Sequence, residues 1–319
     1  MENKITHRYF PEGELFNRAE NRIALASAEN VRRAMKSGQI LEAPALSANT
    51  ELTLEVDLGD DKRGIIPREE AVYLANGESF KEIGIIGRVG KAVAFKVIGE
   101  ERDADGKPLF ILSRRLAQLD CKLNFVDCLE YGDIIDCKVT HTERYGAFCD
   151  VGCGCFALLP VDCISVSRLP HPKERLSAGD FLRVAVKHRD THGRLFVTRR
   201  ELCGTREENA ALYKVGQTVT GIVRSVEDYG AFIELAPNLA GLAEPCAELT
   251  NGTCAAVYIK SIIPEKMKVK LVVIDKCPAL NAPRPTPTFP IEKLEHIDYW
   301  RYSPENCAKL VETHFDGSY

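Results

Sequence analysis

Two stretches of the chain decide its fold because they repeat each other: residues 132–152 read GDIIDCKVTHTERYGAFCDVG, and residues 216–236 read GQTVTGIVRSVEDYGAFIELA. In both stretches the tetrapeptide YGAF begins 13 residues after the opening glycine. Tyr145 and Tyr229 therefore hold the same position in units that recur after 84 residues. Recurrence at a fixed interval identifies the building blocks of a chain before any helix or strand is assigned. The sequence thus predicts tandem copies of one small domain.

A third, weaker copy precedes these two. It consists of GQILEAPALSA from Gly38 and LTLEVDLG from Leu52. Its GIIP from Gly64 parallels the ALLP that begins at Ala157 in the next copy. Together the three copies extend from about Gly38 to Cys277.

Each copy contains short runs that are typical of strands, with β-branched and aromatic residues and with Gly, Asp, Asn or Pro at the breaks. In the middle copy these runs are IIDCKVTH, AFCDVG, FALLPV, FLRVAVKH and RLFVTRR. Five short strands per copy predict a small barrel. We therefore expect a mainly β protein with three tandem five-stranded barrels, a degenerate one over residues 38–120 and two more over 128–204 and 212–277.

The two ends of the chain are expected to be helical. Apolar residues recur at helical spacing between Glu12 and Lys36, and Gly38 is a suitable stop, so residues 1–37 are predicted to form a helical extension. Ser27 could instead cap a second helix, AENVRRAMK. Residues 278–319 are predicted to form a proline-rich linker, APRPTPTFP, followed by two short helices, IEKLEHIDYW and PENCAKLVETHF.

Composition excludes several classes of protein. The 319 residues are 45% hydrophobic and 28% charged, which is typical of folded soluble domains, and the net charge of −4 does not by itself indicate nucleic acid. No run of about 18 apolar residues predicts a membrane helix, and MENKITHRYFPEGEL does not resemble a secretory leader. We therefore expect a cytoplasmic protein with no membrane partner, whose twelve cysteines are reduced.

No cofactor, metal or catalytic site is expected. Cysteines cluster between Cys149 and Cys163, but their spacing matches no standard zinc pattern. His188 and His192 lie four apart on a segment predicted to be strand and turn, where they would not form a helical ligand pair. The sequence contains no nucleotide-binding loop, nucleophile elbow or zinc-protease motif, so it does not predict an enzyme.

The YGAF tetrapeptides carry the most chemical information. Residues three apart on a regular strand face opposite sides, so a bulge at Gly146 is needed for Tyr145 and Phe148 to share one surface. Tyr229 and Phe232 repeat the arrangement. Two neighbouring rings on a barrel surface would stack on the bases of single-stranded nucleic acid. Aromatic residues on strands are more commonly core residues, and that interpretation stays open for both pairs.

With these motifs in place, the copies resemble the S1 RNA-binding domain, the unit repeated in tandem in bacterial ribosomal protein S1. The resemblance implies a five-stranded oligonucleotide-binding (OB) barrel whose second and third strands form the binding face. It also implies that Tyr145 with Phe148, and Tyr229 with Phe232, stack on bases. An Asp before the last strand and an Arg at its start often join them, which points to Asp190 and Arg194.

The first copy departs from the family at the site itself. Leu52 and Glu55 stand where the aromatic residues belong. The third copy lacks the Asp and Arg pair in IIPEKMKVKLVV, and the histidine typical of the third strand is absent from all three copies. The middle copy is therefore the strongest candidate for RNA binding.

The leading functional hypothesis is a non-catalytic protein that binds single-stranded RNA in translation or RNA metabolism, with the ribosome as a second candidate partner. The alternative is a protein-interaction or ribosome-docking scaffold whose nucleic-acid face is vestigial. The net negative charge and the first copy, which lacks the aromatic pair, motivate this alternative.

Overall fold

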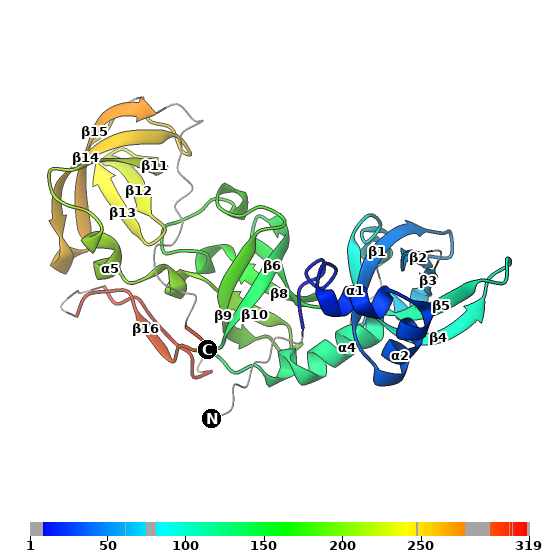
Figure 1. Cartoon of the computed structure of the whole chain (residues 1–319). Helices are drawn as coiled ribbons and strands as arrows, with labels where there is room; N and C mark the ends of the chain where they lie inside the picture. The colour runs from blue at the N-terminus through cyan, green and yellow to red at the C-terminus, as the bar shows by residue number, and fades with distance from the viewer. Residues whose placement is uncertain are drawn as a thin grey trace. The chain divides into compact units, whose positions relative to one another are not determined.

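Three closed five-stranded barrels follow one another along the chain, as the repeats predict (Figure 1). The structure is a computed structural model, and it describes residues 9–60, 62–74, 81–246, 248–277, 294–305, 307 and 309–317. The mainly β fold with tandem barrels is confirmed. No helix among the described residues is long and apolar enough to cross a membrane.

The first barrel has the strand order β1-β2-β3-β5-β4. Its strands are β1 (Leu41–Ala48), β2 (Leu54–Asp57), β3 (Arg63–Ile66), β4 (Ala92–Arg102) and β5 (Pro108–Ser113). The short helix α3 (Ile83–Ile86) precedes β4, and α4 (Arg114–Asn124) follows β5 directly. The sequence reasoning missed α4, although the Ser113 hydroxyl caps it by accepting a hydrogen bond from the Leu116 N–H at 2.9 Å.

Two helices precede the first barrel, α1 (Ala19–Leu25) and α2 (Ala28–Ser37). The Ser27 hydroxyl accepts a hydrogen bond from the Asn30 N–H at 3.2 Å and begins α2, so the alternative of a second helix capped by Ser27 is confirmed. The helical pattern expected from Glu12 is wrong at its start, because α1 begins only at Ala19. Gly38 ends α2 with φ of 67°, in the left-handed region that favours glycine.

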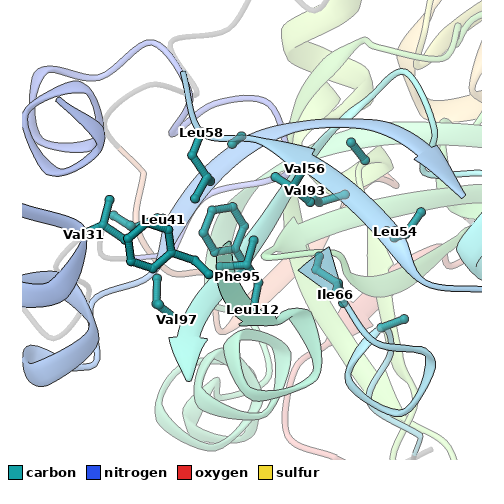
Figure 2. Packing of buried hydrophobic residues seen from close by; sticks show 14 of the residues in the cluster. Val31, Leu41, Leu54, Val56, Leu58, Ile66, Val93, Phe95, Val97 and Leu112 are labelled. Carbon is teal, nitrogen blue, oxygen red and sulfur yellow. The ribbon is translucent and has the colours of Figure 1, made fainter. Parts of the chain in front are cut away.

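The core of the first barrel is formed by side chains from the inner faces of its strands, with Val31 of α2 packed against them. Figure 2 shows the Phe95 ring among Leu41, Val97 and Leu112. All of these residues are buried. The helical extension is therefore part of the same hydrophobic core as the barrel.

The second barrel has the strand order β10-β8-β7-β6-β9. Its strands are β6 (Ile134–Glu143), β7 (Gly146–Gly152), β8 (Cys155–Pro160), β9 (Phe181–Arg189) and β10 (Leu195–Thr198). Burial alternates along β6, where Ile135, Cys137 and Val139 point inward. This period of two is what a strand with one solvent-facing side requires.

The third barrel repeats the order of the first, β11-β12-β13-β15-β14. Its strands are β11 (Thr218–Glu227), β12 (Gly230–Ala236), β13 (Leu239–Ala243), β14 (Cys254–Ile263) and β15 (Lys268–Cys277). Helix α5 (Arg206–Ala211) precedes it. Short 3₁₀ turns at Arg68–Glu70, Val126–Cys128, Val161–Cys163, Pro172–Glu174, Arg200–Cys203 and Pro264–Lys266 connect the elements of the three barrels.

The predicted C-terminal helices are wrong for the part of the tail that the structure describes. There the chain forms a two-stranded antiparallel sheet of β16 (Tyr299–Arg301) and β17 (Glu312–His314). Trp300 and Thr313 face each other across it and are both buried. The predicted proline-rich linker lies outside the described residues, as does the start of the first predicted tail helix.

The chain divides into two compact units. One contains residues up to Leu129 together with Asp150–Phe156, and the other contains Glu130–Cys149 together with the chain from Ala157 onward. The second unit therefore includes the third barrel, the C-terminal sheet and the YGAF segments of both repeats.

Candidate nucleic-acid interface

The Tyr145 and Phe148 rings are neighbours, as the sequence predicted. Their centroids lie 6.1 Å apart and their planes meet at 81°, which is an edge-to-face contact. Tyr145 is 57% exposed, and Phe148 is half-buried. The alternative that these two rings belong to the barrel core is therefore wrong.

Tyr229 and Phe232 reproduce this arrangement in the third barrel. Their centroids lie 6.3 Å apart at 87°, and the rings are 65% and 36% exposed. Two segments 84 residues apart thus build nearly the same aromatic pair on the surfaces of two barrels. The repeat in the sequence corresponds to a repeat in side-chain geometry.

The predicted bulge at Gly146 does not explain how the rings meet. Gly146 is the first residue of β7, so Tyr145 lies in the turn before the strand and is not bound by its alternation. Tyr229 precedes Gly230 in the same way at the start of β12. In the third barrel the register shift lies on the neighbouring strand, between Val223 and Ser225.

Gly146 and Gly230 lie so close to a neighbouring strand that no side chain fits at either position. A Cβ on Gly146 would lie 2.6 Å from the Leu159 carbonyl oxygen, and one on Gly230 would lie 2.2 Å from the Ala243 carbonyl oxygen. Real Cβ atoms do not approach backbone so closely. Glycine therefore lets the Tyr turn close against the neighbouring strand, and this places the Tyr ring beside the Phe ring.

Asp190 and Arg194 pair with each other at the turn between β9 and β10. The Arg194 guanidinium donates to the Asp190 carboxylate at 2.9 Å, and the backbone N–H groups of His192 and Arg194 donate to the same carboxylate. Partial burial opposes the effect, but these hydrogen bonds and the Arg194 charge hold the pKa of Asp190 below its usual value. Strand β8 lies between β10 and β7 in the barrel. The Asp190 and Arg194 pair, at the start of β10, is therefore two strands away from Phe148 on β7.

Two histidines extend the aromatic surface, and sequence reasoning missed both. The His141 ring stacks on Phe148 with centroids 4.4 Å apart and planes at 9°. The His188 ring stacks on Phe196 at 4.5 Å and 14°. Each contact joins neighbouring strands, so only the strand register brings the rings together, and no local motif marks them.

The pKa of His188 is lowered by partial burial and by the neighbouring Lys187 charge, against the opposing effect of Asp190. The imidazole is therefore mainly neutral at pH 7, the form in which it stacks without adding a positive charge. Within the described residues, no group of three or more His, Cys, Asp or Glu side chains is arranged to hold a metal ion.

The first barrel carries no aromatic pair at this position. Leu52 is buried, and Glu55 forms an ion pair with Arg63 across β2 and β3. This barrel therefore presents a carboxylate at the position where the other two barrels present the Phe ring.

No family model matches the chain. Curated relatives do match it. It is 28% identical over 225 residues to the small ribosomal subunit protein bS1 of Staphylococcus epidermidis, covering 68% of this chain and 53% of that protein. It is 26% identical over 255 residues to the small ribosomal subunit protein bS1 homolog of Bacillus subtilis, covering 77% of this chain and 62% of that protein. The chain thus spans little more than half the length of these two relatives.

Among solved structures, the chain is similar to a multidomain protein with nucleic acid binding domains from Streptococcus pneumoniae. The match is 16% identical, covers 74% of this chain and 73% of the other, and has a TM-score of 0.24. The curated relatives and the three five-stranded barrels together confirm what the YGAF repeats indicated: the chain resembles bacterial ribosomal protein S1, and its barrels fit that protein's tandem S1 repeats.

Proposed function

We propose that this protein binds single-stranded RNA without catalysing a reaction, mainly through its second barrel and secondarily through its third, in translation or another step of RNA handling. The observation that carries the proposal is the exposed edge-to-face pair of Tyr145 and Phe148, repeated at Tyr229 and Phe232. Rings exposed on the face of an OB barrel are suited to stacking on successive bases. The relatives named as small ribosomal subunit protein support RNA as the partner.

The charge of the chain sets the character of this binding. The net charge of −4 gives the chain no overall attraction for phosphates, so we expect stacking to supply most of the affinity. We expect sequence preference to be slight because every base has a ring face. The salt dependence of binding should also be shallow, because stacking on rings releases few counterions from the RNA.

The test is a fluorescence anisotropy titration of the full chain with a labelled single-stranded RNA of mixed sequence at low salt. The double variant Tyr145→Ala/Phe148→Ala should bind more weakly by about 1–3 kcal/mol for each lost stack. Tyr299→Ala is the matched control, since it removes a ring that is 45% exposed on the C-terminal sheet. This control should bind as the wild type does.

Two results would contradict the proposal. Unchanged affinity of the folded double variant would remove the assignment of these rings. Absence of any binding by the wild type at high micromolar protein would favour the alternative, a docking scaffold whose nucleic-acid face is vestigial.

A further inference from the structure

The surface of the second barrel holds a row of five side chains, one from each of its five strands. Phe148 of β7 contacts His141 of β6 on one side. Leu158 of β8 and Phe196 of β10 continue the row on the other side, and His188 of β9 ends it by stacking on Phe196. Each end of the row is therefore a stacked His and Phe pair.

The strand register supports this order. Phe196 pairs with Leu158 in the parallel β8–β10 ladder and with His188 in the antiparallel β9–β10 ladder. In the third barrel, Phe232 pairs directly with Leu242 across β12 and β13, and these are the residues 84 positions after Phe148 and Leu158. Side chains paired directly across neighbouring strands lie about 5 Å apart at Cβ and point to the same face.

The exposure of these residues is suited to contact with a ligand. His141 is exposed, and Phe148, Leu158, Phe196 and His188 are all half-buried. Their neighbours on the strands, including Leu159, Leu195 and Val197, are buried in the barrel. The row thus belongs to the outer face, where an apolar side chain is not needed for the core.

The other two barrels have no rings at the positions equivalent to Phe196 and His188. In the third barrel, the register places Lys270 opposite Leu242 and Ser261 opposite Lys270. In the first barrel, Ile111 lies opposite both Ile65 and Gly99. Since the three barrels share one fold, the barrel core does not require rings at these two positions.

A cation lies at the Phe196 end of the row. Arg194 lies directly before β10, two residues ahead of Phe196. The Arg194 side chain is 63% exposed while it pairs with Asp190. An exposed guanidinium and a ring on the same barrel provide the two kinds of contact, phosphate and base, that single-stranded RNA binding combines.

We propose that the His188 and Phe196 pair is a second base-stacking surface of the second barrel, so that RNA crosses this barrel from Tyr145 and Phe148 over Leu158 to Phe196. This inference rests on the proposed function and deepens it. It assigns the middle barrel a longer binding track than the third, whose equivalent positions carry Lys270 and Ser261.

The experiment is an anisotropy titration of full-length variants with a labelled ten-nucleotide oligouridylate. Phe196→Leu keeps an apolar side chain of similar size but removes the ring, and it should weaken binding about 5-fold or more. Phe196→Tyr restores a ring and should bind nearly as the wild type does. His188→Ser introduces the residue found in the third barrel and should also weaken binding.

Phe148→Ala in the same titration separates the two proposals. If Phe148→Ala weakens binding while Phe196→Leu matches the wild type, the second stacking surface is wrong and the proposed function stands. If the wild type binds but neither variant changes the affinity, the assignment of the Phe148 ring fails together with this inference. If the wild type does not bind at all, the proposed function itself fails. If Phe196→Tyr is as weak as Phe196→Leu, the ring acts only through barrel packing and the inference is also overturned.

Discussion

At the scale of single residues, the site depends on two glycines as much as on the rings. Gly230 has φ of 148° and lies against the Ala243 backbone, so a side chain there is strained in both conformation and space. Gly146 meets the Leu159 backbone in the same way. The glycine of the YGAF tetrapeptide therefore fixes the turn that carries the Tyr ring.

We expect Gly230→Ala to destabilise the third barrel by about 1–3 kcal/mol, because the new methyl group must displace the neighbouring strand. Chemical denaturation of the full chain measures this loss. Gly99→Ala is the control, since its Cβ would lie 3.6 Å from Ile111, an ordinary contact. Equal stability of the two variants would show that the close approach at Gly230 is not a constraint.

Much of the site could be predicted at this scale, and the reason for the rest is physical. The YGAF tetrapeptide predicted both pairs of neighbouring rings because each pair is local in sequence. The His141 and His188 contacts could not be predicted, since His188 meets Phe196 only through the β9–β10 register. The predicted bulge at Gly146 was wrong, because Tyr145 lies in the turn before β7. A turn and a bulge can bring the same two rings together, so the sequence could not distinguish them.

At the scale of elements, Glu42 of β1 holds the segment before α1 against the first barrel. Its carboxylate accepts hydrogen bonds from the backbone N–H groups of Gly13 and Phe16, and its own N–H donates to the Asn21 side chain at 2.9 Å. Burial raises the pKa of Glu42 to about 7, although these N–H donors oppose the shift.

This raised pKa predicts a pH dependence of stability. A carboxyl group whose pKa rises from 4.5 to about 7 on folding favours the folded state fully below pH 4.5, and this contribution is lost as the pH rises through 7. Burial and the Glu12 charge also raise the pKa of Asp150 to about 7, so this carboxyl group changes stability with pH in the same direction. Calorimetry should show a lower melting temperature at pH 8 than at pH 5.

Glu42→Gln removes one of the two titrating groups, so the melting temperature of this variant should depend less on pH. The variant is also expected to be less stable at every pH, because the amide N–H₂ group cannot accept a hydrogen bond from a backbone N–H. The quantity to compare between the variant and the wild type is therefore the change of melting temperature with pH. A slope identical to that of the wild type would contradict the role of Glu42.

The elements themselves were predicted where the repeat is strong. The strands of the C-terminal tail were not predicted. Over such short segments the apolar residues fit a helical and an alternating pattern equally well, and these residues are Trp300, Tyr302, Thr313 and Phe315. The structure buries all four, with one intervening residue between the members of each pair, which is the period of strands. Short apolar segments cannot be assigned to helix or strand from their own pattern alone.

At the scale of the whole molecule, buried charges tie the second barrel to the third. Glu234 of β12 is fully buried and forms ion pairs with Arg175, which follows the 3₁₀ turn Pro172–Glu174, and with Arg224 of β11. Arg224 also pairs with Glu174. Burial and the Arg224 charge lower the pKa of Arg175, and the Glu234 charge opposes them. The two barrels that carry aromatic pairs thus share one charged junction.

Glu234→Gln should destabilise this unit by about 3–5 kcal/mol, because it leaves two buried guanidinium groups without their shared carboxylate. A lower urea midpoint measures the effect. Glu227→Gln, at an exposed position on the adjacent strand, is the control and should remain within about 0.5 kcal/mol of the wild type. A Glu234→Gln midpoint as high as that of the control would show that the junction does not stabilise the unit.

Photo-crosslinking of the full chain to RNA that contains 4-thiouridine shows whether bases lie on the paired rings of the second and third barrels. Mass spectrometry of the digested complex then identifies the attached residues. We expect attachment at or beside Tyr145 and Phe148, and less often at Tyr229 and Phe232. Attachment confined to the first barrel or to the C-terminal sheet, with the YGAF peptides unmodified, would contradict this expectation.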